Sequence, residues 1–176
     1  MSFLNNKKQK YKFLTGFTLI EIMVVMVILG LLATIIIAIG RNTMQSAKIK
    51  KTAQDLRALT NAIELYFDRY EYYPADVSRG LPSGIEVFLT SGKLPRGLWN
   101  DTCYDWDNWV DPATGGAIRQ MSLRFCCAQG PTGCKPPIAN FDYYSAIYYC
   151  LQGACRAHSS MPINHPALCV NCGKPI

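Results

Sequence analysis

Eight cysteines could do chemistry in this chain, and all of them lie after Trp99. They are Cys103, Cys126, Cys127, Cys134, Cys150, Cys155, Cys169 and Cys172. Cysteines in proteins form disulfides, hold zinc or exchange electrons. An even number confined to one part of the chain favours structural disulfides in an oxidising compartment. We expect Cys150 and Cys155 to pair across a turn that contains Gly153, and we leave the other pairings open.

Zinc and redox chemistry are the two alternatives for these cysteines. The sequence Cys169-Val-Asn-Cys172-Gly resembles half of a zinc knuckle, but a four-thiolate site needs a second pair at similar spacing. The other close-set pairs do not supply that spacing convincingly, whether Cys126-Cys127 or Cys150 with Cys155. A thioredoxin-type pair starts a helix, a context that the proline-rich tail lacks. Both alternatives therefore rank below disulfides.

Four aspartates crowd a predicted loop that also contains three tryptophans. The aspartates are Asp101, Asp105, Asp107 and Asp111, and the tryptophans are Trp99, Trp106 and Trp109. Oxygen-rich loops bind calcium, yet this spacing is not that of an EF-hand, and turn aspartates are commonly solvated. We therefore expect no cofactor, with calcium at the four aspartates as the alternative. The tryptophans should pack in the core or between subunits.

The two histidines, His158 and His165, do not accompany a serine and an acid at a recognisable nucleophile motif. The sequence therefore predicts no catalytic residue and no enzyme. Both histidines lie in a polar tail, where we expect them to be exposed.

The first secondary-structure element predicted from the sequence is a long helix, which precedes the segment that contains these residues. Residues 17–40 form an apolar stretch of 24 residues, which at about 1.5 Å per residue can cross a bilayer core of roughly 30 Å. Residues 41–73 carry apolar side chains every three or four positions, as an amphipathic helix does. Pro74 should end this helix, because the residue before a proline avoids the helical conformation.

The remaining residues, 74–176, are predicted to form a Cys-rich globular head. Glycines and prolines divide its first part, leaving room for one short helix at 84–90. Aromatic and apolar runs predict strands at 122–126 and 143–150. The tail from 158 onward contains three prolines and is expected to be irregular.

The positive charge of the chain is concentrated at its beginning. Lys7, Lys8, Lys10 and Lys12 precede the apolar stretch, as expected of a cytoplasmic flank. Loss of these four lysines with a leader would reduce the net charge from +6 to +2. Binding to nucleic acid is therefore not indicated.

A short motif joins the basic flank to the apolar stretch. Thr15-Gly16-Phe17-Thr18-Leu19-Ile20-Glu21 with the apolar run behind it resembles the type IV pilin and type II secretion pseudopilin family. The resemblance implies that a prepilin peptidase removes residues 1–16 by cutting between Gly16 and Phe17, and that the new amino group of Phe17 is methylated. It also implies an α+β pilin fold, in which a long N-terminal helix, transmembrane in its first half, packs on a small antiparallel sheet.

Glu21 has a physical reason to matter that is independent of the resemblance. An acid within a membrane span costs about 2.5–3.5 kcal/mol and usually has a partner. Cleavage would create a cationic amine at Phe17, one helical turn away. Pairing Glu21 of an arriving subunit with the Phe17 amine of a neighbour would neutralise both charges. The alternative is that Glu21 reaches the membrane surface and favours the helix dipole without any role in assembly.

The sequence thus predicts a structural subunit of a type IV pilus-like homo-oligomeric filament. Its partners would be prepilin peptidase, an assembly platform and an assembly ATPase. It would cross the cytoplasmic (inner) membrane once, with the head extracytoplasmic, and would reach the cell surface within the assembled filament. One alternative is a type II secretion or competence pseudopilin, and an alternative of another class is a membrane-tethered extracytoplasmic zinc or redox domain.

Overall fold

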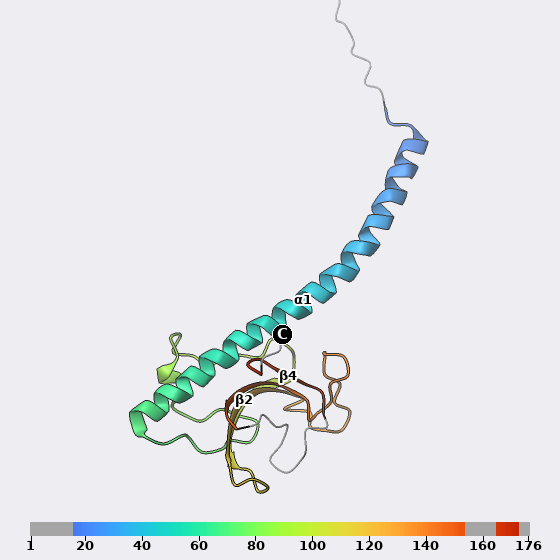
Figure 1. Ribbon diagram of the computed structural model, residues 1–176. Helices are drawn as coiled ribbons and strands as arrows, with labels where there is room; N and C mark the ends of the chain where they lie inside the picture. The colour runs from blue at the N-terminus through green and yellow to red at the C-terminus, as the bar shows by residue number, and fades with distance from the viewer. Residues whose placement is uncertain (1–15, 154–164, 173–176) are drawn as a thin grey trace, which may run out of the picture. The chain divides into compact units, whose positions relative to one another are not determined.

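The computed structural model describes residues 16–153 and 165–172, and in these residues it has one α-helix, one 3-10 helix and four strands (Figure 1). The elements in order are α1 (Leu19–Tyr70), η1 (Ile85–Phe88), β1 (Thr102–Val110), β2 (Ala117–Phe125), β3 (Ala146–Gln152) and β4 (Ala167–Cys169). The chain divides into two compact units after Thr43, and α1 contributes residues to both. An α+β pilin-like fold is thereby confirmed.

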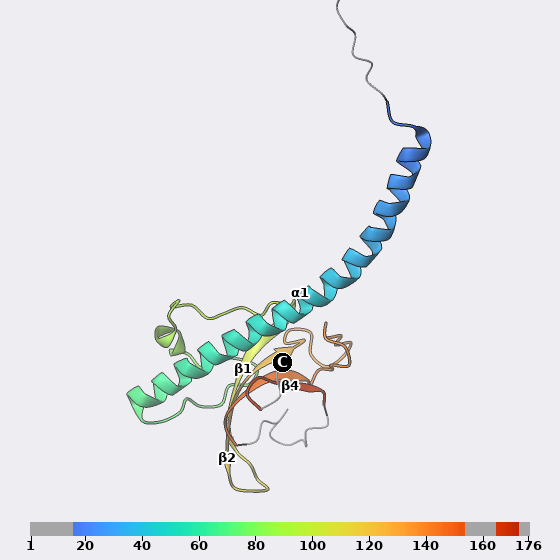
Figure 2. The same cartoon turned by 45° about the horizontal axis from the view of Figure 1, so that its top comes forward.

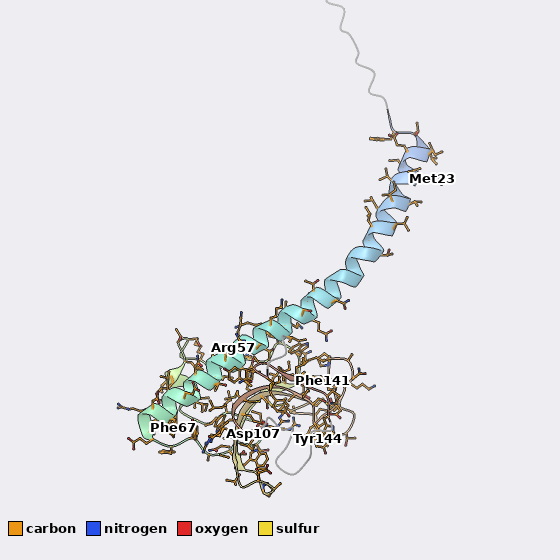
Figure 3. All side chains as sticks on the ribbon, in the orientation of Figure 1. Met23, Arg57, Phe67, Asp107, Phe141 and Tyr144 are labelled. Carbon is orange, nitrogen blue, oxygen red and sulfur yellow. A yellow bond between two sulfur atoms is a disulfide. The ribbon has the colours of Figure 1, made fainter. Side chains whose placement is uncertain are left out.

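The described residues of the first unit present an exposed apolar helix surface. Leu19 is 78% exposed and Met26 is 66% exposed. Figure 3 shows Met23 and its neighbours projecting from this part of the helix. Apolar surface of this extent needs another apolar partner.

The sequence predicts a membrane span over residues 17–40. Among the described residues, no helix combines the length and the apolar character that crossing a membrane requires.

In the second unit, the C-terminal half of α1 lies across one face of the sheet (Figures 1 and 2). Leu56, Leu59 and Ile63, spaced by three and four residues, are fully buried, which confirms the predicted amphipathic stripe. They pack in one core with sheet residues that include Trp106, Met121, Leu123, Phe125 and Ile147. Toward the end of α1 the residues of this stripe become exposed to solvent, since Phe67 is 37% and Tyr70 is 48% exposed.

A buried hydrogen bond ties α1 to β1. The Tyr104 hydroxyl donates to Asp55 Oδ2 over 3.0 Å, and Lys51 Nζ lies 2.6 Å from Asp55 Oδ1. Asp55 is only 7% exposed, so its carboxylate depends on these two partners. Burial, together with the negative charge of Asp55, raises the pKa of Tyr104, which therefore stays a donor at physiological pH.

We expect Tyr104→Phe to lower the free energy of unfolding of the head by about 1–3 kcal/mol, because one oxygen of a buried carboxylate loses its donor. Urea unfolding of residues 45–176 measures this change. Tyr72→Phe, at an exposed tyrosine beyond the helix, serves as the control and should change stability by less than about 0.5 kcal/mol. Equal effects of the two substitutions would contradict the proposed tie.

The sheet has the strand order β1-β2-β3-β4. β1 pairs antiparallel with β2 from Thr102↔Phe125 to Val110↔Ala117, and β2 pairs antiparallel with β3 across a register shift at Arg119 and Gln120. β4 pairs parallel with β3. The sheet is therefore mixed, and the prediction of a purely antiparallel sheet is wrong at this last strand.

Two further predictions are wrong. The acidic segment is not a loop, because most of it forms β1, and the tail is not wholly irregular, because it contributes β4. The helix also ends slightly early, since Glu71 has a φ of 63°, a left-handed conformation that stops an α-helix. The short helix expected at 84–90 is present as the 3-10 helix η1.

Candidate functional site

The predicted processing site immediately precedes the start of α1. Residues 16–18 are not helical, and Phe17 is 78% exposed. Thr18 caps the helix, because its Oγ1 accepts a hydrogen bond from the Glu21 N–H over 3.3 Å and its carbonyl accepts one from Ile22. The Gly16–Phe17 bond therefore lies in a non-helical, exposed segment ahead of a capped helix, and its cleavage stays a prediction.

Glu21 stands in the first turn of α1 and is exposed. Among residues 16–153 and 165–172, no ion pair involves its carboxylate. The residues around it, Ile20 and Ile22 among them, are apolar and exposed. Its position suits the helix dipole, and it also leaves the carboxylate available to a cation from another subunit.

The four aspartates considered for calcium are spread over separate places. Asp101 accepts hydrogen bonds from the backbone N–H groups of residues 128 and 129. Asp111 accepts from the backbone N–H of Ala113 and from the Thr114 hydroxyl in the β1–β2 turn. Asp105 and Asp107 lie on β1 and contact Arg124. Each carboxylate thus has protein partners, and calcium stays the untested alternative to the expectation of no cofactor.

Arg124 is the centre of a buried polar cluster on the sheet face opposite α1. Its Nε lies 2.9 Å from Asp105 Oδ2, and its terminal nitrogens lie 3.3 Å from Asp107 Oδ2 and 2.9 Å from the Tyr148 hydroxyl. Side chains alternate along a strand, so Tyr104 and Trp106 face the core while the aspartates face Arg124. Figure 3 marks Asp107 on the sheet.

Asp107 should make the stability of the head depend on pH. Burial, and then the nearby Asp105, raise the pKa of Asp107 to about 6, although Arg124 and Gln120 oppose the shift. The folded head then binds the proton more tightly than the unfolded chain, so the stability gained from this proton is lost as the pH rises through about 6.

We expect Asp107→Asn to flatten this pH dependence. From pH 4 to pH 7 the wild-type head should lose on the order of 1–2 kcal/mol relative to the variant. Urea unfolding at several pH values measures the difference, with the exposed Asp68→Asn on α1 as a control that should follow the wild type. Parallel profiles for wild type and Asp107→Asn would contradict the assignment.

The described cysteines are oxidised. Cys103 pairs with Cys127, Cys126 with Cys134, and Cys169 with Cys172. The adjacent residues Cys126 and Cys127 thus fasten the end of β2 to two different segments. Cys150 is also disulfide-bonded, and its predicted partner Cys155 lies outside the described residues.

The tail histidine that the structure describes has a partner. His165 Nδ1 lies 2.7 Å from Asp142 Oδ2, and its ring packs against Tyr144, which Figure 3 labels. Burial is the largest single effect and raises the pKa of Asp142, but the hydrogen bonds from His165 and Ser145 and the charge of His165 together outweigh it, so the pKa is lowered. His165 is therefore half-buried and not fully exposed as predicted, and His158 lies outside the described residues.

Sequence reasoning missed β1 and the closeness of Cys150 to the Cys169–Cys172 pair. The alternation of residues 103–107 (Cys-Tyr-Asp-Trp-Asp) was an available signal for the strand. The meeting of Cys150 with Cys169 and Cys172 had no local signal, because it depends on the parallel pairing of β3 and β4.

Comparison with known proteins agrees with these features. Residues 15–37 match the family model described as the prokaryotic N-terminal methylation motif. Type II secretion system core protein G of Aeromonas hydrophila is 40% identical over 135 residues, which cover 73% of this chain and 92% of that protein. The protein of the same name from Pseudomonas aeruginosa is 30% identical over 139 residues, covering 73% and 95% of the two chains.

The corresponding protein of Vibrio cholerae is 29% identical over 144 residues, covering 73% of this chain and 92% of its own length. No solved structure shows a significant match. The N-terminal motif and the α+β fold define a pilin-like structural subunit and not an enzyme. More narrowly, the chain belongs to the pseudopilin family of type II secretion system core protein G. These relatives favour the secretion pseudopilin over the type IV pilus, which the sequence alone had placed first.

Proposed function

We propose that this chain is a structural subunit of the pseudopilus of a type II secretion system. Its similarity to type II secretion system core protein G along 73% of its length carries the proposal. In this function the chain has a structural role: it contributes one helix for assembly and one folded head on the filament. Its partners would be other copies of itself, a prepilin peptidase, and the assembly platform and ATPase of the system.

Processing and anchoring form the first part of the proposed function. Prepilin peptidase would cut between Gly16 and Phe17, where the chain is not helical and Phe17 is exposed, and the new amine of Phe17 would be methylated. Before assembly, residues 17–40 would hold the subunit in the cytoplasmic membrane, with the lysine-rich leader inside and the head outside. Disulfides in the head support an oxidising location for it.

Assembly is the second part. The Glu21 carboxylate of an arriving subunit would pair with the Phe17 amine of a neighbour, so that both charges are compensated in apolar surroundings. The exposed apolar side chains of the first unit, including Leu19 and Met26, would then be buried against other copies of the same helix. Support for this packing comes from the exposure of these apolar side chains in the described part of the first unit.

Deleting the gene in the bacterium that encodes it tests the function. We expect type II substrates to accumulate in the periplasm and disappear from the medium, while surface pili and motility stay unchanged. A plasmid copy of the gene should restore secretion, and electron microscopy after overproduction should show filaments that react with an antibody to the head. Normal secretion with lost surface pili would instead assign the chain to a type IV pilus.

A further inference from the structure

Three cysteine sulfurs meet beside the sheet: Cys150 lies on β3, Cys169 on β4 and Cys172 in the segment after β4. Cys150 Sγ lies 3.8 Å from Cys169 Sγ and 3.6 Å from Cys172 Sγ. All three sulfurs lie within 4.8 Å of one another, and among the described residues this is the one group of three or more candidate metal ligands. Cys150 and Cys169 are half-buried and Cys172 is exposed, so a metal ion could reach them from solvent.

Strand pairing and hydrogen bonds also hold these cysteines together. β4 pairs parallel with β3, which places Cys169 opposite Tyr148. The Asn171 side chain then accepts a hydrogen bond from the Cys150 N–H over 2.9 Å and donates one to the Cys150 carbonyl over 2.7 Å. The Val170 N–H also donates to the Tyr148 carbonyl over 2.8 Å. These contacts hold the Cys169-x-x-Cys172 turn beside Cys150 and do not themselves involve a disulfide.

Two of the three sulfur–sulfur distances have the spacing of a metal site, and the third pair is joined as a disulfide. Zinc binds thiolates at about 2.3 Å, so the sulfurs of a tetrahedral site lie about 3.8 Å apart. The two distances from Cys150 match this value. Cys169 and Cys172, now joined, have Cα atoms 5.5 Å apart, and rotation of their side chains can open the sulfurs to the same spacing. A Cys-x-x-Cys-Gly turn is also a common form for one half of a zinc site.

We propose that Cys150, Cys169 and Cys172 form a zinc site that competes with disulfide formation as the head matures. The newly made chain carries thiols, so binding needs no reductant: three thiols and one Zn²⁺ give three Zn–S bonds and release three protons. The fourth tetrahedral position is left for solvent or another donor. Oxidation is the alternative fate of the same thiols and gives the disulfides of the present structure. In surroundings with little oxidant, zinc would stabilise the part of the head formed by β3 and β4.

Cobalt provides a direct test, because Co²⁺ bound to thiolates in a tetrahedral site absorbs strongly in the visible and near ultraviolet. The full-length chain in detergent, reduced by a phosphine without oxygen, should bind one Co²⁺ with this spectrum, and Zn²⁺ should displace it. Cys150→Ser, Cys169→Ser and Cys172→Ser should each weaken binding by at least about tenfold. Cys103→Ser, which removes a thiol from a separate disulfide, should bind Co²⁺ like the wild type.

Two results would overturn the proposal. One is the lack of a tetrahedral thiolate spectrum in the wild type, and the other is an equal loss of binding in Cys103→Ser and Cys172→Ser, since that is the behaviour of unspecific chelation. A second measurement uses the wild type alone, so that the test does not depend on whether the variants fold. Zn²⁺ should protect Cys150, Cys169 and Cys172 from alkylation in the reduced chain, as mapped by peptide mass spectrometry. Protection confined to other cysteines would also refute the site.

Discussion

Glu21→Ala is expected to abolish filament formation while leaving cleavage after Gly16 intact. The variant keeps the apolar helix and the predicted processing site, but under the proposed pairing the Phe17 amine of each neighbour loses its counter-charge. A charge within a membrane span costs about 2.5–3.5 kcal/mol, and this cost would recur at every subunit added to the filament. Electron microscopy of overproducing cells measures filaments, and the N-terminal residue of the purified subunit measures cleavage.

Thr18→Ala separates this role of Glu21 from a role in starting the helix. Thr18 Oγ1 accepts the hydrogen bond from the Glu21 N–H, so its loss removes the cap and costs about 0.5–2 kcal/mol of helix stability. The Glu21 carboxylate is untouched, and we expect filaments to form. Filaments from Glu21→Ala, or their loss in both variants to the same degree, would contradict the pairing of Glu21 with Phe17.

Arg124→Met is expected to destabilise the head by about 3–5 kcal/mol. Methionine approximates the volume of the arginine stem but leaves Asp105 and Asp107 buried without their cation, and breaking a buried ion pair has a cost of this size. Asp105 is 3% exposed, and its other oxygen has no hydrogen-bond partner among the described residues, so water and protein offer it little compensation. Urea unfolding of residues 45–176 measures the loss.

Arg119→Met is the matched control on the same strand. Arg119 lies over the Tyr73 ring at 4.2 Å and hydrogen-bonds to Gln152, without a carboxylate partner among the described residues. Its replacement should cost about 1 kcal/mol or less. Arg124→Met combined with Asp105→Asn should recover part of the stability. Equal losses of unfolding free energy in Arg119→Met and Arg124→Met would show that removal of the buried positive charge is not the cause of the destabilisation.

The helical part of the fold could be predicted because its signals are local. A continuous apolar stretch, a stripe of period three to four and Pro74 define α1 to within a few residues. The strands were less accessible. β1 carries aspartates that are favourable on a strand only because Arg124, on the next strand, faces them, and no local pattern announces that partner. β4 has three residues, and its parallel pairing with β3 is a purely tertiary event.

The candidate sites divide in the same way. The motif from Gly16 to Glu21 is contiguous, so its residues were all named from the sequence. The pairing of Cys103 with Cys127 follows from the register of β1 on β2, where Cys103 lies opposite Arg124. That register depends on burial of Trp106 and Met121 against α1. Disulfide connectivity therefore cannot be predicted until the fold is known, whereas the processing site can be predicted from the sequence alone.

The neighbouring bridges of Cys126 and Cys127 have a mechanical consequence. If the head is pulled through its backbone from both sides, force arriving at Cys103 crosses its sulfur to Cys127, steps back one peptide bond to Cys126, and leaves through Cys134. Residues 104–125 and 128–133 then carry no tension. The β1–β2 hairpin, which holds Trp106 and Arg124, is therefore shielded from the pulling force, and its strands are not drawn apart through their own backbone.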